Sequence, residues 1–244
     1  MSSEYIDLQN WTQIHTHILH LEEQGLVTRT FRRLDPDRQQ VILTAILDEA
    51  VDKGPESLNI KHVAKRAGVS VGSLYTYFPN RDGMLSFAVQ VCARFVIDQF
   101  NQFRPYLKAL PLREALEAYV AGGVEWSQLY TGFLRLFARA AYHGESELSE
   151  SLVRPIATTM REIVTEIITV AADRGELRKE IDIEATIRII HTLTIAVGDS
   201  HLLPYLNTYF QVVDDNISPE RHLTALLDFI MQGIGNPHAN GENK

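Results

Sequence analysis

A short segment, residues 70–78, combines residue types that suit close contact between a helix and a polar surface. If it forms a helix, with about 100° per residue, Leu74 and Phe78 fall on one side. The opposite side is small and polar, and holds Gly72, Ser73 and Thr76. Small residues let a helix approach the edges of DNA bases, and hydroxyl groups can bind phosphate oxygens, so this pattern favours a nucleic-acid contact.

Two tyrosines and a serine border this polar side. Tyr75 and Tyr77 flank it, where their phenol groups could reach phosphates on both strands. Ser70 stands at the helix N-terminus, where free N–H groups also suit a phosphate. The same pattern fits a helical hairpin packed on the rest of the chain, with both tyrosines on the surface. The helical pattern by itself leaves both interpretations open.

Three helices are expected to position the segment. Asp35 can cap a first helix that ends before Gly54, and Asn59 can cap a second. Gly68 ends the second helix because glycine tolerates positive φ, and Pro79 closes the third after about two turns. Two short helices joined by a tight glycine turn and supported by a longer helix predict a helix-turn-helix.

The run from Ile60 to Leu85 resembles the DNA-binding signature of the tetracycline-repressor (TetR) family. The resemblance covers about residues 30–85, and its most specific part reads Ala67-Gly68-Val69-Ser70, then Leu74-Tyr75-Thr76-Tyr77-Phe78. It implies a transcriptional regulator, most often a repressor, that binds an inverted-repeat operator in double-stranded DNA as a dimer and is released by a small molecule.

The resemblance also implies roles for single residues. Val71, Gly72, Ser73 and Tyr75 match positions that meet bases and nearby backbone, and Lys61 matches a position that can touch a base. Tyr77 and Arg81 match phosphate contacts, and Arg81 stands where the family usually has lysine. With the two hydroxyl residues from the helical pattern added, the expected DNA-binding residues are Lys61, Ser70, Val71, Gly72, Ser73, Tyr75, Thr76, Tyr77 and Arg81.

Residues 1–34 form a leader that departs from the commonest family pattern. Apolar residues recur in it at helical spacing, at Leu8, Trp11, Ile14, Ile18 and Leu21. Its basic end, with Arg29, Arg32 and Arg33, could lie along phosphates or enter a minor groove. The alternative, which we favour here, is a helix packed on the domain with a solvated basic turn.

Composition agrees with this organisation. The chain has 244 residues, 45% hydrophobic, and a net charge of −8. Residues 29–94 hold ten Lys/Arg against seven Asp/Glu, a net +3, so the remainder carries −11. The single cysteine, Cys92, cannot form an internal disulfide, and no export signal or membrane span is visible. We therefore expect a cytoplasmic protein.

The rest of the chain predicts an all-α fold with a larger helical body. The helix after Asp182 is apolar on most of its circumference, and the last helix has two apolar faces, so both are expected to be buried on two sides. The resemblance implies a homodimer through these two helices. The predicted domains are a helical extension (1–34), a helix-turn-helix domain (35–82), a ligand-binding and dimerisation domain (83–236) and a disordered tail (237–244).

Aromatic and polar residues collect in the predicted body, where the family binds its effector. They suit an apolar pocket with a few orienting groups, although each one could equally be core. The candidates are Phe87, Trp126, Tyr130, Phe133, Phe137, Tyr142, His143, Met160 and His191. No cofactor is expected besides an unidentified small-molecule effector. The helix from Asn80 joins the two predicted domains and is expected to transmit effector binding to the DNA-binding helices.

Other classes of function find less support. A metal site at His15, His17 and His20 lacks further ligands, and His15 and His17 lie about 200° apart on a helix. The neighbours Asp199-Ser200-His201 cannot adopt the geometry of a catalytic triad. No catalytic or metal-ligating residue is therefore expected. A helix-turn-helix that binds a protein instead of DNA, and activation instead of repression, stay open.

Overall fold

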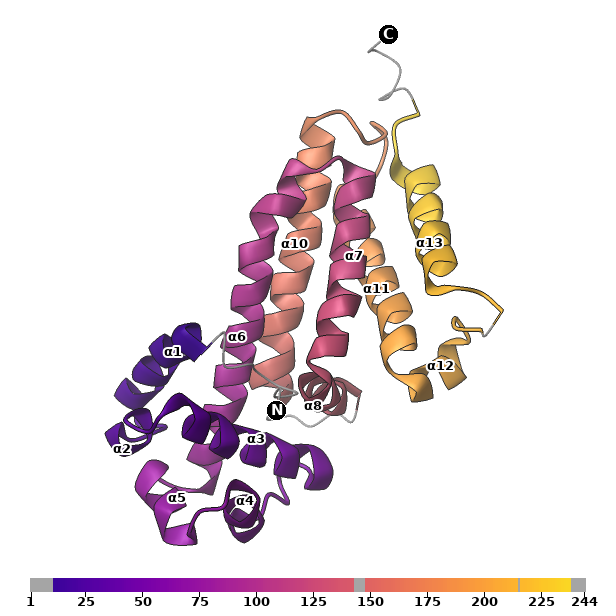
Figure 1. Ribbon diagram of the computed structural model, residues 1–244. Coiled ribbons are helices and arrows are strands. Elements are labelled where there is room, and N and C mark those ends of the chain that lie inside the picture. The colour runs from indigo at the N-terminus through magenta and orange to yellow at the C-terminus, as the bar shows by residue number, and fades with distance from the viewer. Residues whose placement is uncertain (1–10, 143–147, 215, 238–244) are drawn as a thin grey trace. The chain divides into compact units, whose positions relative to one another are not determined.

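The computed structural model describes residues 11–142, 148–214 and 216–237, and the regular elements within them are helices (Figure 1). The expected all-α class is therefore confirmed. The first half contains α1 (Trp11–Glu23), α2 (Arg29–Arg32), α3 (Pro36–Lys53), α4 (Ile60–Ala67), α5 (Val71–Tyr77), α6 (Arg81–Ala109) and α7 (Leu112–Leu129). The second half contains α8 (Thr131–Tyr142), the π-helical turn η2 (Ser149–Val153), α10 (Arg154–Asp173), α11 (Ile183–Leu202), α12 (Pro204–Phe210) and α13 (Pro219–Ile234).

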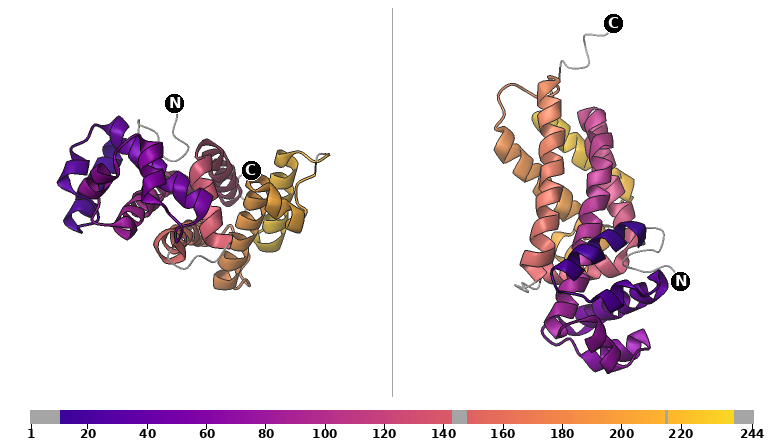
Figure 2. Two further views of the ribbon diagram at one scale, coloured as in Figure 1. Left: turned by 90° about the horizontal axis from the view of Figure 1, so that it is seen from below. Right: turned by 90° about the vertical axis from the view of Figure 1, so that its left-hand side faces the viewer.

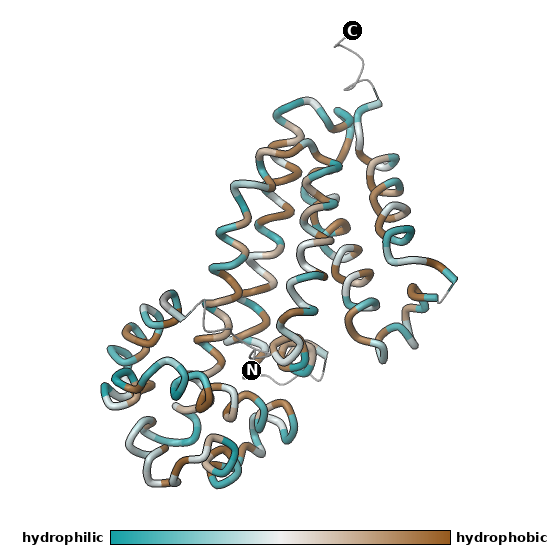
Figure 3. The backbone as a smooth tube through the Cα atoms, in the orientation of Figure 1, coloured by the Kyte–Doolittle hydropathy of each residue, from teal (hydrophilic) through white to brown (hydrophobic). Residues whose placement is uncertain are grey.

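The chain divides into two compact units. The first comprises residues 1–99 and 129–157, and the second comprises residues 100–128 and 158–244. In both units the helices alternate apolar and polar residues along each turn, as Figure 3 shows by colour. Each unit therefore buries an apolar side of its own helices.

The first unit holds α1 to α5, the first part of α6, and α8. Its leader is packed: Trp11, Ile14, Ile18 and Leu21 are at most 4% exposed. Figures 1 and 2 show α1 alongside α6. The two helices are joined by His17 Nε2, which lies 2.7 Å from Asp98 Oδ2. Residues 11–34 of the leader thus belong to the folded unit, and residues 1–10, with the expected apolar position Leu8, lie outside the described residues.

The second unit is a bundle of α7, α10, α11 and α13 with the last part of α6. Its core is aliphatic and is centred on residues such as Leu116, Val164, Ile168 and Leu227. Arg113 of α7 forms an ion pair with Asp228 of α13 at 2.8 Å. These contacts hold the four helices along their lengths.

One helix boundary differs from the one expected, and one expected break is present. The helix expected to end at residue 103 continues through Pro105 to Ala109. Its last turns are held by the buried side chain of Leu107 and by Arg104, which donates two hydrogen bonds to Glu166. The helix predicted over residues 182–212 had a possible break near Pro204, and the structure has that break: α11 ends at Leu202, and Pro204, which has no N–H, begins the separate helix α12.

Candidate DNA-binding face

Caps and one glycine fix the place of α5. The side chains of Asp35, Asn59 and Ser70 accept hydrogen bonds from the first backbone N–H groups of α3, α4 and α5. Gly68 ends α4 in the left-handed region at φ 62°, and Val69 donates to the carbonyl of Ala64 at 3.0 Å. The expected helix-turn-helix is therefore present, with the caps where the sequence placed them.

The inner side of α5 is anchored by an aromatic cluster. Leu74 is 2% exposed and Phe78 is 1% exposed. The Phe78 ring lies 5.3 Å from that of Phe31 in α2 and 5.4 Å from that of Phe87 in α6. Burying rings of this size contributes about 1.5–3 kcal/mol each. The expected inward side of α5 is confirmed.

The outer side of α5 is polar and accessible. Gly72 and Thr76 are exposed, and Tyr75 is 56% exposed. Ser73 is half-buried and shares a hydrogen bond with Ser70 at 2.8 Å. The outward side is thus available to a partner, and its contact with DNA stays a prediction, because a packed hairpin with surface tyrosines would expose the same side.

Val71 and Tyr77, two further residues expected to contact DNA, lie at the margins of the polar side of α5. Val71 is half-buried. Tyr77 is half-buried too, and its ring meets Phe31 edge-on at 5.9 Å, while its carbonyl accepts the N–H of Thr28 at 2.9 Å. Lys61 is exposed at the start of α4. Val71 and Tyr77 therefore have packing roles in addition to the DNA contacts expected of them.

Arg81 is engaged within the protein. Its Nε donates to the carbonyl of Leu58 at 3.1 Å, a second nitrogen donates to the carbonyl of Pro55, and a third lies 2.8 Å from Asp82. The guanidinium ties the loop before α4 to the start of α6. Its phosphate contact stays a prediction, and what the structure adds is a positioning role.

A charged cluster that the sequence reasoning missed joins α3 to α4. Glu49 is fully buried, and its two oxygens lie 3.3 Å from Arg66 Nε and 3.0 Å from His62 Nδ1. Arg66 also donates to Asp52 at 2.5 Å, and this hydrogen bond and the neighbouring carboxylates raise the pKa of the guanidinium. The signal was available in the acidic residues one turn apart on α3, Asp48, Glu49 and Asp52.

The effector candidates are distributed over both units. Phe87 belongs to the aromatic cluster behind α5. In the first unit the rings of Phe95 and Tyr130 lie 5.6 Å apart, those of Phe133 and Phe137 lie 6.0 Å apart, and Tyr142 is 43% exposed. The candidates in the second unit are Trp126, Met160 and His191, each half-buried. His143 lies outside the described residues, as do residues 238–244 of the predicted tail.

The second unit buries polar atoms of Tyr119, which the sequence did not single out, and of His191, which is one of the effector candidates. Tyr119 of α7 is 7% exposed, and its hydroxyl has no hydrogen-bond partner within the described residues. The Nδ1 atom of His191 is likewise buried without one. Burial raises the pKa of Tyr119, and burial with the charge of Arg161 lowers the pKa of His191. Neutral, unsatisfied groups of this kind suit a ligand that brings its own donors or acceptors.

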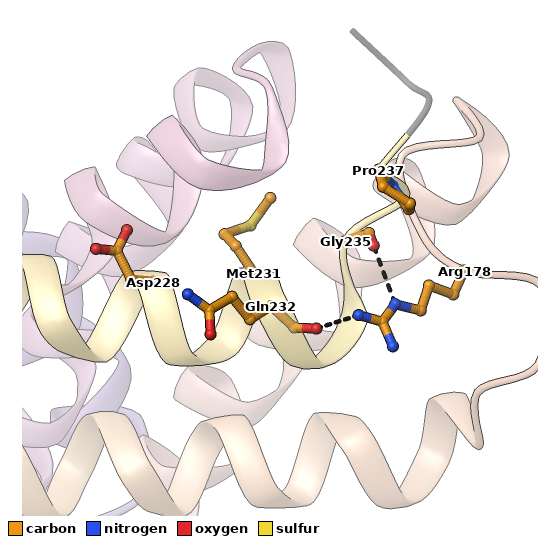
Figure 4. A pocket seen from close by; sticks show the side chains of 6 residues that line it. All are labelled: Arg178, Asp228, Met231, Gln232, Gly235 and Pro237. Carbon is orange, nitrogen blue, oxygen red and sulfur yellow. Dashed lines mark hydrogen bonds between the residues drawn. The ribbon is translucent and has the colours of Figure 1, made fainter.

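A pocket of about 400 Å³ lies at the end of α13 (Figure 4). It is lined by Arg178, Asp228, Met231, Gln232, Gly235 and Pro237. Arg178 donates to the carbonyls of Gln232 and Gly235, so its charge is already partnered. None of the expected effector residues lines this pocket.

Two other expectations concern a metal site and a catalytic triad. Across residues 11–142, 148–214 and 216–237, no three His, Cys, Asp or Glu side chains gather as a metal site would require. The Ser200 hydroxyl donates to the carbonyl of Ala196, and the His201 ring lies against His222.

None of the helices in the described part of the chain combines the length and apolar character needed to cross a bilayer.

Known proteins resemble the helix-turn-helix and, more distantly, most of the chain. The sequence model "Bacterial regulatory proteins, tetR family" matches residues 42–86, from α3 into α6. The HTH-type transcriptional repressor KstR2 of Rhodococcus jostii is 22% identical over 201 residues, 80% of this chain and 92% of KstR2.

Solved structures share the fold. A TetR family transcriptional regulator from Chloroflexus aurantiacus has a TM-score of 0.58 at 15% identity, covering 87% of this chain and 100% of that one. The regulator FadR from Bacillus subtilis, solved with stearoyl-CoA, has a TM-score of 0.52 at 18% identity, covering 79% and 97%.

An exposed, small and polar face on the second helix of a helix-turn-helix defines a DNA-binding transcriptional regulator. The match at residues 42–86 is to the TetR family, and the curated repressor KstR2 resembles the chain over 80% of its length.

Proposed function

We propose that this regulator is a repressor that binds an inverted-repeat operator as a homodimer and leaves it when a small molecule binds the second unit. The observation that carries the proposal is the outer side of α5, where Gly72, Tyr75 and Thr76 are exposed above a buried anchor. A helix of this kind fits a major groove, and its smallest residue permits close approach to base edges.

The dimer is supported by apolar side chains left exposed on the last long helices. Ile189 of α11 is 58% exposed and Phe229 of α13 is 66% exposed, while the opposite sides of both helices belong to the core of the unit. Large apolar groups gathered on a surface mark an interface. A second copy of the chain is the partner that an operator with two half-sites requires.

Binding of an effector is supported by the polar atoms within the second unit. Tyr119 and His191 have buried polar atoms without a hydrogen-bond partner among the described residues, in a bundle whose core is otherwise aliphatic. A ligand that binds better to a conformation with misplaced α5 helices would lower the affinity for the operator. Acyl-CoA compounds, beginning with stearoyl-CoA, are the first probes because FadR was solved with that ligand.

Selection of duplexes from a random DNA pool tests the proposal. We expect enrichment of an inverted repeat, and light scattering should give a complex with two protein chains per duplex. No enrichment at low salt, or enrichment of a sequence without two-fold symmetry, would contradict it.

The same selection, repeated with each probe, tests release. An effector should lower operator affinity in the wild type, and Tyr119→Phe, which removes only the hydroxyl, should alter the ligand concentration required. A ligand that binds the protein and leaves operator affinity unchanged would contradict the proposed mechanism.

A further inference from the structure

The basic residues of the DNA-binding unit differ in whether the protein itself neutralises them. Arg32 pairs with Glu22, Arg66 with three carboxylates of α3, and Arg81 with carbonyls and Asp82. Arg38 donates to the carbonyl of Gly68. Carboxylates thus neutralise Arg32, Arg66 and Arg81, whereas Arg38 keeps its charge and has one donor engaged, so the count of positive charge in residues 29–94 overstates what DNA can use.

A second group of basic side chains makes no ion pair or hydrogen bond with the described residues. Arg29 and Arg33 are exposed, and neither side chain makes an ion pair or hydrogen bond with another described residue. Lys61 and Lys65 of α4 are exposed in the same way. Lys53 at the end of α3 is exposed too, and the other four residues of this group belong to α2, its C-cap and α4, two helices that both contact α5.

The contact between α2 and α5 is built from specific bonds. The Thr28 hydroxyl donates to the carbonyl of Thr76 at 2.8 Å, and the Thr28 N–H donates to the carbonyl of Tyr77 at 2.9 Å. These bonds satisfy carbonyls at the end of α5 that have no partner within the helix. The start of α2 is thereby fixed to the end of the helix that is expected to enter the groove.

The orientation of α2 follows from its buried residue. Phe31 is fully buried against Tyr77 and Phe78. Arg29 and Arg33 precede and follow it by two residues, which on a helix places both on the opposite, outward side, within about 40° of one another. Two guanidiniums without a partner among the described residues thus lie one turn apart on the side of α2 that faces away from the aromatic cluster, while Thr28, next to Arg29, is bonded to the end of α5.

We infer that Arg29 and Arg33 form a phosphate clamp that holds one DNA strand beside the groove occupied by α5. The inference rests on the proposed function and adds to it a binding site in the leader. Guanidinium groups match phosphate oxygens geometrically, and such contacts position a protein on DNA without reading its sequence. The leader, packed by α1, is then a scaffold that presents this pair.

The salt dependence of binding measures the clamp directly. Each phosphate neutralised adds about 0.9 to the slope of log affinity against log salt concentration, and a dimer carries four of these arginines. Arg29→Ala with Arg33→Ala should reduce the slope by about 3 to 4. Arg29→Lys with Arg33→Lys should keep most of it, since the charges remain.

The probes are the duplex enriched by selection and poly(dA-dT). The matched control removes two exposed charges from the second unit, by Lys108→Ala with Lys179→Ala. We expect the control to keep the wild-type slope on both duplexes. The arginine variant should unfold at the wild-type temperature and enrich the wild-type sequence, because the clamp contacts only phosphates.

The outcomes separate the clamp from the proposed function. A slope reduced by less than about 2 in the arginine variant, or reduced equally in the control, overturns the clamp. A changed enriched sequence also overturns it, because the arginines would then read bases. A wild-type protein that ignores both duplexes at low salt contradicts the proposed function itself.

Discussion

Gly72 has a role that packing within the protein does not explain. A Cβ built there would lie 3.7 Å from Ser70 Oγ, which is an ordinary van der Waals distance, and Gly72 is not among the glycines with positive φ. Neither space nor backbone conformation requires glycine. We propose that glycine stands here because α5 approaches DNA closely, where a missing side chain leaves room for the edges of the bases.

Gly72→Ala should therefore separate stability from binding. Alanine favours a helix over glycine by up to about 1 kcal/mol, so the unfolding temperature should stay level or rise. Affinity for the selected duplex should fall about tenfold or more, since a lost base contact costs about 1–3 kcal/mol. Fluorescence anisotropy and thermal unfolding measure the two effects.

Gly123→Ala is the matched control, because it adds a methyl group to an open position of helix α7. It should leave DNA affinity unchanged. Equal affinity of Gly72→Ala and the wild type would show that α5 does not approach DNA through this position.

At the scale of elements, one buried side chain joins the leader to the helix-turn-helix. Gln39 of α3 is 1% exposed; its Oε1 accepts from Trp11 Nε1 at 2.7 Å, and its Nε2 donates to the carbonyls of Phe31 and Arg32. It thereby connects α1, α2 and α3. The aromatic contact between Phe31 and α5 depends on this arrangement.

Gln39→Leu keeps a similar volume and removes all three hydrogen bonds. Each buried group left unpaired costs about 1–3 kcal/mol, so we expect the free energy of unfolding to fall by about 2–4 kcal/mol. Denaturant titration measures the loss. The same change at exposed Gln102 of α6 should have little effect, and a similar loss at both sites would contradict the role of Gln39.

The sequence predicted the elements of the DNA-binding face better than their connections. Caps such as Asn59 and Ser70, and the inward turn of Leu74 and Phe78, follow from local rules and were predicted correctly. The bonds of Thr28 to the end of α5 join residues 48 and 49 positions apart, which no periodicity reveals. The internal pairing of Arg66 and Arg81 was hidden for the same reason, because it depends on tertiary contacts.

At the scale of the whole molecule, the proposed dimer depends on exposed apolar side chains of α11 and α13. Phe229→Glu places a charge in the proposed interface and should yield monomers by light scattering, with operator affinity at least about tenfold weaker because the two half-sites are no longer held together. Leu129→Glu is the matched control, since both side chains are 66% exposed and Leu129 lies outside these helices. Dimers that persist in Phe229→Glu would contradict this interface.

The stability of the chain should also depend on pH through its buried histidines. Burial lowers the pKa of His191 and of His201, with smaller contributions from Arg161 and His222 respectively. The unfolded chain then binds more protons than the folded chain just below the ordinary histidine value of about 6.5, so the free energy of unfolding should fall as the pH drops below that value.

Denaturant titrations at a series of pH values test this dependence. His191→Gln should flatten it, while His15→Gln, at an exposed position of α1, controls for the substitution itself. A free energy of unfolding that rises on acidification, or that falls with the same slope in His191→Gln, would contradict the assignment.

Methylation interference on the selected duplex tests most directly whether α5 reads DNA in the major groove. Methylation of guanine N7 changes only the major-groove edge of the base. We predict that it blocks binding in two symmetric patches about one helical turn apart, or a multiple of it, one patch for each α5 of a dimer. Interference confined to adenine N3 in the minor groove, or found at a single patch, would contradict the account.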